Sequence, residues 1–233
     1  LRGVIMKIAL CMSGYVGYFN PFKIGSIDSQ QSKPLPIGIG YESLQKYFIQ
    51  DKDVDTYIHS WDVEREDEIL ETYKPKKYVM EKQKGEDDGI FDKTYSQWYS
   101  KCEALRLALN SKVEYDWYMV TRFDLAFGIN FDFDNLDNNN LYIAGGQRPI
   151  EMNDVYFLSG YGMMRHISEF FDYGLGNYTI GNGAGNEPGG AHYEIGKYCR
   201  KFLEMSKGKV NYIGSDVGEE NIMFVRLLLE ENN

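Results

Sequence analysis

The chain has 233 residues, and its 35 acidic residues outnumber its 25 basic ones, which gives a formal charge of −10. This balance argues against a protein that wraps nucleic acid or lies on an anionic membrane, because both need clustered Lys and Arg. Apolar residues make up 43% of the chain, yet no run of them is long enough to span a bilayer. The length and composition fit one folded domain over residues 1–233.

The cysteines give a first indication of the compartment. Cys11, Cys102 and Cys199 are odd in number and far apart in the sequence. We therefore expect neither a disulfide framework nor a zinc site, and we expect a cytoplasmic protein. The first apolar run is too short for a secretory signal, and Met6 is a candidate initiator.

Strands and helices alternate in the first half of the chain. The apolar run at residues 5–11 predicts a buried strand that ends in a turn at Ser13 and Gly14. Residues 20–40 contain several Pro, Gly and Ser residues and predict a loop, whereas residues 41–50 have helical spacing. The next expected elements are a strand at 54–61, a helix at 63–73, a strand at 76–81, a helix at 95–110 and a strand at 117–120 that ends in Arg122, Phe123 and Asp124.

The second half predicts shorter elements. Residues 174–190 are rich in glycine, which predicts a long loop that could act as a lid. The other expected elements are a turn at 135–140, strands at 141–144 and 155–159, helices at 162–172 and 191–206, a strand at 210–213 and a helix from about Glu219.

This alternation predicts an α/β fold with a mainly parallel central sheet flanked by helices. Ligands of such sheets bind at the carboxyl ends of the strands. The positions of interest are therefore those that follow the apolar runs: residues 13–14, 59–62, 122–124 and 159–160.

Several common chemistries have no motif in this chain. We find no G-x-G-x-x-G after the first strand, no Walker lysine motif, no G-x-S-x-G elbow and no H-E-x-x-H. The only histidines are His59, His166 and His192, which are scattered along the sequence and argue against histidine-rich metal catalysis.

A carboxylate and an arginine stand at the end of the strand at 117–120. Asp124 could hold a divalent cation that bridges two phosphates. Arg122, two residues earlier, shares a face with Asp124 if the strand continues, and its guanidinium suits a phosphate oxygen. The alternative interpretation is an ordinary ion pair at a strand end.

Three residues at the ends of the first two strands are candidate donor-binding residues. Ser13 and Gly14 would let backbone N–H groups approach a nucleotide, although a plain tight turn explains Gly14 equally well. Asp62 could accept hydrogen bonds from a ribose or a base, or it could cap the acidic helix that follows.

Four segments give the chain a resemblance to a known family. In order, they are MKIALCMSG, VDTYIHSWD, YSQWYSKCEALRLAL and YDWYMVTRFDLAF. They resemble a group of small glycosyltransferases that is similar to GT-A-type nucleotide-sugar transferases of bacterial polysaccharide clusters and large viruses. The resemblance implies a GT-A-like fold with a donor half at residues 6–125 and an acceptor half at 126–233.

In that group an R-x-D strand end takes the place of the D-x-D motif. The resemblance therefore implies that Asp124 contacts Mn2+ or Mg2+, or the diphosphate itself, and that Arg122 assists. The group usually carries an arginine in its first turn where this chain has Gly17, and Lys101 is one candidate substitute.

The resemblance also implies roles for residues farther along the chain. It suggests that Gln97 and Lys101 face the donor cleft, although a lysine at a helix position is commonly exposed. Asn153 and Asp154 look like a pair that lies near the sugar, where Asp154 would orient hydroxyls or act as the catalytic base. A simple turn is the alternative for Asn153 and Asp154.

Glu187 and Glu194 flank the glycine-rich loop and the helix after it, and either is a second candidate base. Glu194 is preferred because a helical residue holds its geometry better than a loop tip. His192 is assigned to capping or packing.

The function implied is transfer of a sugar from a nucleotide-diphosphate donor to a glycan, lipid-linked or protein-linked acceptor, as in polysaccharide biosynthesis. No nucleic-acid partner is expected. Two alternatives stay open: a metal-dependent nucleotidyltransferase or phosphohydrolase, and a non-catalytic carbohydrate-binding domain, which an aromatic content of 15% would suit.

Overall fold

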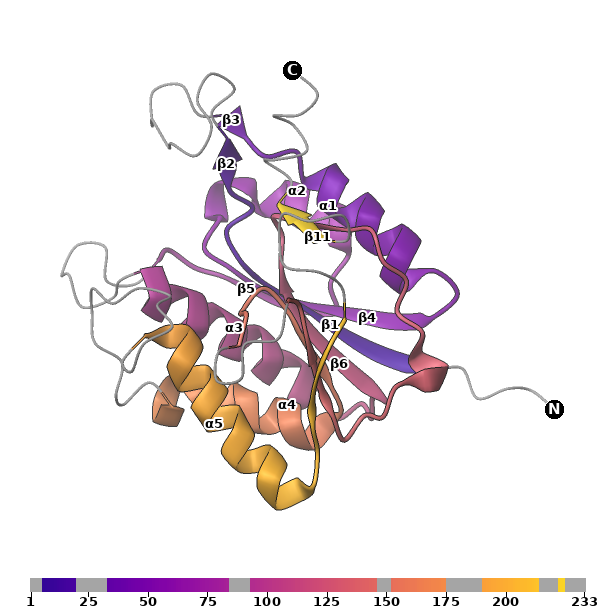
Figure 1. Cartoon of the computed structure of the whole chain (residues 1–233). Helices are drawn as coiled ribbons and strands as arrows, with labels where there is room; N and C mark the ends of the chain where they lie inside the picture. Colours follow the sequence, from indigo (N-terminus) through magenta and orange to yellow (C-terminus); the bar gives the residue numbers. More distant parts are fainter. Residues whose placement is uncertain are drawn as a thin grey trace.

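The structure is a computed structural model that describes residues 6–19, 33–83, 93–145, 152–174, 190–213 and 222–224. Its centre is a seven-stranded sheet in the order β10-β8-β9-β6-β1-β4-β5 (Figure 1). The strands of this sheet are β1 (Lys7–Gly14), β4 (Asp53–Ser60), β5 (Lys77–Met80), β6 (Trp117–Arg122), β8 (Leu141–Ile143), β9 (Phe157–Ser159) and β10 (Val210–Tyr212).

Two further pairs of strands lie outside the central sheet. They are β2 (Tyr18–Phe19) with β3 (Lys33–Pro34), and β7 (Leu125–Phe127) with β11 (Ile222–Phe224), both antiparallel. The α-helices are α1 (Ile37–Leu44), α2 (Glu66–Tyr73), α3 (Lys93–Leu109), α4 (Tyr161–Ser168) and α5 (Ala191–Ser206), and short helical turns cover Gln45–Ile49, Val63–Arg65, Phe133–Asn135 and Phe170–Gly174.

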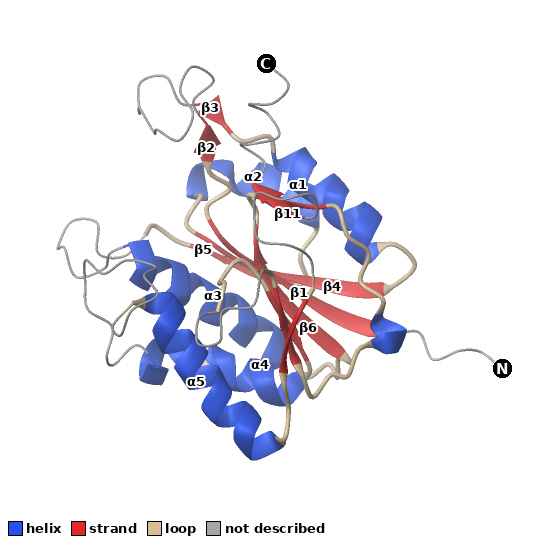
Figure 2. Ribbon diagram, viewed as in Figure 1, coloured by secondary structure: helices blue, strands red, loops and turns tan. Residues whose placement is uncertain are grey.

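The predicted fold class, α/β with a mainly parallel central sheet flanked by helices, is confirmed. β1 pairs in parallel with β4 and β6, β4 pairs in parallel with β5, and β10 with β8. β9 is the exception, because it runs antiparallel to both β6 and β8. Figure 2 shows α3, α4 and α5 on one face of the sheet and α1 and α2 on the other.

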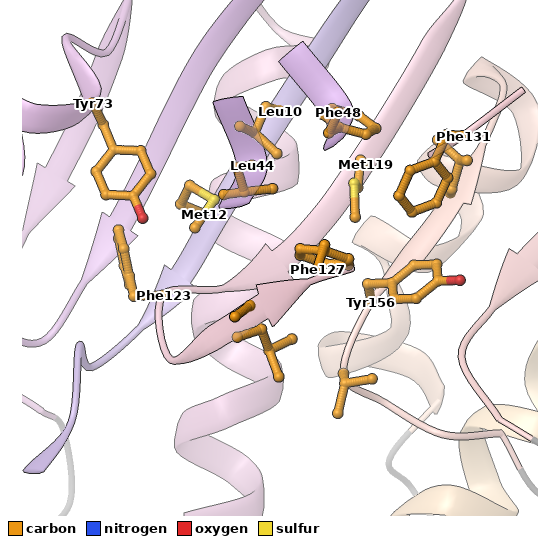
Figure 3. Close-up of a cluster of buried hydrophobic side chains, with 14 of the residues drawn as sticks. Leu10, Met12, Leu44, Phe48, Tyr73, Met119, Phe123, Phe127, Phe131 and Tyr156 are labelled. Carbon is orange, nitrogen blue, oxygen red and sulfur yellow. The ribbon is translucent and has the colours of Figure 1, made fainter. Parts of the chain in front are cut away.

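Alternating side chains of β1 supply both cores. Leu10 and Met12 pack in the cluster on the α1 side, whereas Ala9 and Cys11 pack in the cluster on the α3 side. Such alternation follows from the two-residue period of a strand, and burial on both faces explains why this strand reads as a continuous apolar run. In Figure 3, Leu44 of α1 lies against Leu10 and Met12.

Two boundaries differ from those that the sequence predicts. β1 does not end before Ser13 and Gly14 but includes both, because they stay paired with β4. α1 begins at Ile37, inside the segment expected to be a loop, and its Gly40 packs closely against the backbone of Phe123 and Leu125. Most of the glycine-rich segment lies outside the described residues.

The helix expected from about Glu219 is wrong at Ile222–Phe224, which form β11. These residues pair with β7, a strand that was not predicted from the sequence. The pairing supplies hydrogen-bond partners for the backbone groups of β7. None of the helices in the described ranges is long and apolar enough to cross a membrane.

Candidate functional site

The site lies at the carboxyl edge of the sheet, where the strand order reverses. From β1 the chain proceeds through α1 to β4 and then through α2 to β5, whereas β6, reached through α3, lies on the other side of β1. Ligands of open α/β sheets bind in the crevice at such a reversal. In the register of the two strands, Ser13 of β1 is paired with Arg122 of β6, so both predicted residues border this crevice.

Gly14 is the last residue of β1 at this edge, but its polar groups are already bonded. Its N–H donates to Ser100 Oγ at 2.8 Å, and its carbonyl accepts from Ser60 Oγ at 2.7 Å. The approach of this N–H to a nucleotide stays a prediction, and it would require the Gly14 N–H to leave Ser100. What Gly14 offers is a φ of +91° and open space where a Cβ would stand. The Ser13 hydroxyl turns inward and donates to the Thr121 carbonyl at 3.0 Å.

A buried histidine holds Ser100 in place. His59 is fully buried, with Nδ1 2.8 Å from Ser100 Oγ and Nε2 3.0 Å from Glu81 Oε1. Ser100 also donates to the His59 carbonyl at 3.0 Å. This network could not be predicted from the sequence, because its members come from β4, from α3 and from the residue after β5.

Asp62 follows β4 and is 4% exposed. Its side chain does not cap the helical turn after it, so the capping alternative is not what the structure shows. The carboxylate accepts a hydrogen bond from the backbone of Val16, while Oδ2 has no partner among the described residues. Burial raises the pKa of Asp62 above its usual range, against the opposing charge of Arg65. A buried carboxylate oxygen that has no partner in the described ranges is the kind of atom that a ligand donor would satisfy.

Asp154 is the centre of a cluster of polar side chains. Lys101 Nζ donates to its carbonyl and lies 3.2 Å from Oδ2, and Gln97 donates to the same oxygen. His192 Nε2 of α5 lies 3.3 Å from Oδ1. Gln97 and Lys101 are one turn apart on α3, as their spacing predicts.

The reversed direction of β9 explains how Asp154 reaches the site. Because β9 is antiparallel to β6, the residues before β9 lie at the carboxyl edge of β6, where Thr121 Oγ1 donates to the Val155 carbonyl at 3.3 Å. Ser159 and Gly160, expected at this edge, lie at the opposite one for the same reason.

The charges in this cluster shift one another's protonation. Burial alone would raise the pKa of Asp154, but Lys101, His192 and Arg122 together hold it well below its usual range. Burial lowers the pKa of Lys101 to about 8, although Asp154 opposes the shift. The contact between Lys101 and a donor phosphate stays a prediction, and the structure instead shows Lys101 1% exposed with its ammonium bonded to Asp154.

Arg122 and Asp124 form a bidentate ion pair. Nε donates to Oδ1 at 2.8 Å and Nη2 donates to Oδ2 at 2.6 Å. The alternative reading of these residues, an ion pair at a strand end, is what the structure contains. Asp124 also lies beside the first loop, since a Cβ on Gly17 would be 3.9 Å from the Asp124 Cβ.

The predicted metal site does not fit these residues as they stand. Both oxygens of Asp124 are bonded to Arg122, so a cation there would have to displace the guanidinium. Within the described ranges, no group of three His, Cys, Asp or Glu side chains could hold a metal ion. The divalent cation therefore stays a prediction.

The remaining predicted residues have separate surroundings. Asn153 Oδ1 accepts from the Val155 N–H at 3.3 Å, which is the simple turn given as the alternative. Glu194 is 5% exposed in the first turn of α5. It lies two residues after His192, so the two side chains do not share a helix face. His192 itself was missed, because nothing in the sequence connects it with Asp154.

Comparisons with known proteins give distant structural likenesses. No family model matches the chain, and no curated protein sequence matches it. A glycosyltransferase involved in the glycosylation of the major capsid of PBCV-1 superposes with a TM-score of 0.49 at 10% identity, covering 98% of each chain. A proposed nucleotide-diphospho-sugar transferase from Desulfovibrio desulfuricans G20 gives 0.48 at 9% identity, covering 91% of this chain and 82% of its own. Likeness at this level carries no inference about activity, so function has to be argued from the site.

Proposed function

We propose that the protein transfers a sugar from a nucleotide-diphosphate donor to a hydroxyl acceptor. The observation that supports this proposal is the convergence of Asp62, Arg122 and the Asp154 cluster on the crevice where the strand order reverses. Such a crevice is the usual nucleotide position in open α/β sheets. Sugar transfer also needs hydrogen-bonding groups that orient the reacting hydroxyl, and the Asp154 cluster can provide them.

The two ends of the site suit the two ends of the donor. Asp62, with a buried oxygen that has no partner in the described part of the chain, would accept a hydrogen bond from a ribose hydroxyl or a base N–H beside Gly14. Arg122 is the cation best placed for the diphosphate, because it borders the crevice while Lys101 is buried behind Asp154. A guanidinium there would stabilise the charge that develops on the leaving diphosphate.

The charges of the inner cluster are balanced before any ligand binds. Lys101 faces Asp154, and Arg122 faces Asp124. A diphosphate must therefore draw Arg122 from Asp124 or arrive with its own counterion. No step of the transfer is assigned to a divalent ion, and the effects of Mn2+ and Mg2+ on donor binding are measured separately. We also propose that the acceptor is a glycan or a lipid-linked or protein-linked sugar, as the sequence resemblance implies.

A thermal-shift screen tests the donor site. The full chain is mixed with UDP-glucose, UDP-galactose, GDP-mannose or GDP-fucose, each with and without Mg2+ or Mn2+. A donor present at 100 times its dissociation constant should add about 2.7 kcal/mol of apparent stability. Replacing Asp62 with Asn removes a charged acceptor worth about 1.5–3 kcal/mol, so affinity should fall by about tenfold to about a hundredfold.

Asp67→Asn is the matched control, because Asp67 is exposed on α2. The proposal would be contradicted if no donor in the panel produced a thermal shift, or if the wild type and Asp62→Asn showed equal thermal shifts. Product analysis separates the rival classes. Release of a nucleoside diphosphate supports sugar transfer, whereas release of pyrophosphate or phosphate supports a nucleotidyltransferase or phosphohydrolase.

A further inference from the structure

A hollow lies between the second half of α5 and the start of β10, and the donor proposal does not use it. Its volume is about 600 Å³, and its lining includes Arg200, Leu203 and Glu204 of α5. Lys209 and Val210 of the returning chain also line it. In Figure 1 the chain turns at the lower end of α5 and returns upward in yellow. A volume of this size lies within the range of small-molecule sites.

This α5–β10 hollow lies at the amino edge of the sheet, opposite the crevice. Val210 begins β10 and is paired with Leu141, the first residue of β8. β8 and β6 are both antiparallel to β9, so β8 begins at the edge where β6 begins. Along α5, Arg200 follows His192 by eight residues, which is about 12 Å of helix. A ligand in the hollow would therefore occupy a site separate from the crevice.

Arg200 indicates what kind of ligand the hollow would bind. Its Nε is buried and has no hydrogen-bond partner in the described part of the chain. A buried donor without a partner is rare in folded proteins, because it has lost water and gained nothing in return. Arg122 shows how such a group is satisfied, since its Nε and Nη2 donate to the two oxygens of one carboxylate. An oxyanion would complete the same arrangement at Arg200.

The other side chains of the hollow also suit an organic anion. Lys209 is exposed and adds a second positive charge, whereas Glu204, also exposed, adds a negative one. Two cations around one hollow are a local exception in a chain whose formal charge is −10. Leu203 and Val210 supply apolar surface on which the carbon atoms of a ligand can pack.

We propose that the α5–β10 hollow binds a small organic oxyanion, in which a phosphate or a carboxylate is carried by a carbon skeleton. Arg200 donates to two oxygens of the anion, and Lys209 supplies the second positive charge. The carbon skeleton lies against Leu203 and Val210. This inference goes beyond the proposed function, because it concerns the opposite edge of the sheet.

An NMR titration tests the hollow in the full chain without any nucleotide sugar. The Nε–H signal of Arg200 is identified by its loss in Arg200→Gln. The wild type is then titrated at constant ionic strength with glucose 6-phosphate, glucuronate, inorganic phosphate and neutral glucose. We expect the signal to move with at least one of the two sugar anions, at a dissociation constant below about 1 mM, and not with glucose. The tighter of the two sugar anions tells a phosphate ligand from a carboxylate ligand.

Four variants measured by titration calorimetry separate the hollow from the general charge of the chain. Arg200→Gln should weaken binding of the sugar anion by about tenfold to about a hundredfold, and Lys209→Gln by about twofold to about fivefold. Glu204→Gln should strengthen binding by about twofold to about fivefold, because it removes a repelling carboxylate. Lys201→Gln, at an exposed position of α5 outside the lining, is the control and should bind as the wild type does.

Several results would overturn the site. They are an Arg200 signal that moves with neither sugar anion, including one that moves with inorganic phosphate alone, and equal weakening in Arg200→Gln and Lys201→Gln. If Arg200→Gln fails to fold, Lys209→Gln and Glu204→Gln still decide, because both positions are exposed and their effects should have opposite signs.

The donor panel is repeated on Arg200→Gln, because nucleotide sugars also carry phosphate. A donor shift that persists in Arg200→Gln and falls in Asp62→Asn belongs to the crevice, and both proposals then stand or fall separately. A donor shift that is lost in Arg200→Gln and kept in Asp62→Asn supports the hollow as a phosphate site and contradicts the proposed function.

Discussion

Lys101 is a charged residue whose removal should be costly. Its side chain is fully buried against Asp154 and lies over the Trp98 ring, with Nζ 4.6 Å from the ring centroid. Breaking a buried ion pair by removing one partner leaves an uncompensated charge. We expect Lys101→Met to lower the free energy of unfolding by about 3–5 kcal/mol, as measured by urea denaturation.

The double variant Lys101→Met with Asp154→Leu should recover much of that loss, because it removes both charges. Lys201→Met, at an exposed position of α5, should change the stability by no more than about 0.5 kcal/mol. A loss below about 1 kcal/mol in Lys101→Met would show that the pair is solvated in solution.

The sequence located the members of the site better than it described their interactions. Asp62 and Arg122 were expected at the carboxyl edge because they follow strands, whereas Lys101 and Asp154 were expected near the donor only through the family resemblance. Lys101 and Arg122 both act on Asp154 in the structure. Their pairings could not be predicted, because a lysine at a helix position has no local sign of burial. His192 was missed because its contact depends on where α5 begins relative to Asp154, which only the tertiary fold determines.

At the level of elements, α1 shows why the glycine content of residues 20–40 led to a wrong prediction of where the helix begins. Gly38 and Gly40 made residues 20–40 look like a loop throughout, yet both lie in the helix. A Cβ on Gly40 would stand 2.7 Å from the Phe123 carbonyl oxygen and 3.0 Å from that of Leu125. The glycine therefore permits close packing of α1 on the turn that carries Asp124.

Gly40→Ala should lower the free energy of unfolding by about 1–3 kcal/mol, because backbone atoms cannot yield to the new methyl group. Gly38→Ala in the same helix is the matched control. Its Cβ would meet only Glu42 Oε1, at 3.8 Å, so alanine should stabilise the helix by about 0.5–1 kcal/mol. Chemical denaturation measures both. Equal effects at the two positions would mean that the contact with Phe123 is absent.

β9 is the element on which prediction of the site depended most. The alternation of strands and helices indicated a parallel sheet, and six of the seven central strands, in the order given above, do share a direction. Strand direction is set by connections rather than by residue pattern, so the short apolar run of β9 gave no sign of its reversal. The sequence placed Asp154 near the sugar only through the family resemblance.

At the scale of the whole molecule, the free energy of unfolding should depend on pH, because paired carboxylates stabilise the fold only while they are ionised. Asp154 has a folded pKa below its unfolded value, which is about 3.9. Asp55 shifts the same way: its burial opposes the shift, but hydrogen bonds from Lys76 and Tyr115 prevail. Folding therefore favours the deprotonated forms, so this stabilisation is complete above the unfolded pKa and is lost as the pH falls through the folded one.

We expect the free energy of unfolding of the wild type to decrease as the pH falls below about 4. Asp154→Asn should show a shallower decrease, because one titrating group has been removed. Asp67→Asn, an exposed control, should keep the wild-type slope. Urea denaturation at a series of pH values measures these slopes. An unchanged slope in Asp154→Asn would mean that this carboxyl is not held by its partners.

The hydrogen bonds of the Gly14 backbone affect the entropy cost of ligand binding. Its N–H and carbonyl are satisfied by serines from α3 and β4, so this part of the crevice is ordered before anything binds. A ligand that lands there incurs little entropy loss from ordering the backbone. The Gly14 amide should accordingly exchange its hydrogen slowly, although it belongs to the last residue of a strand, where amides usually exchange faster than in the strand interior.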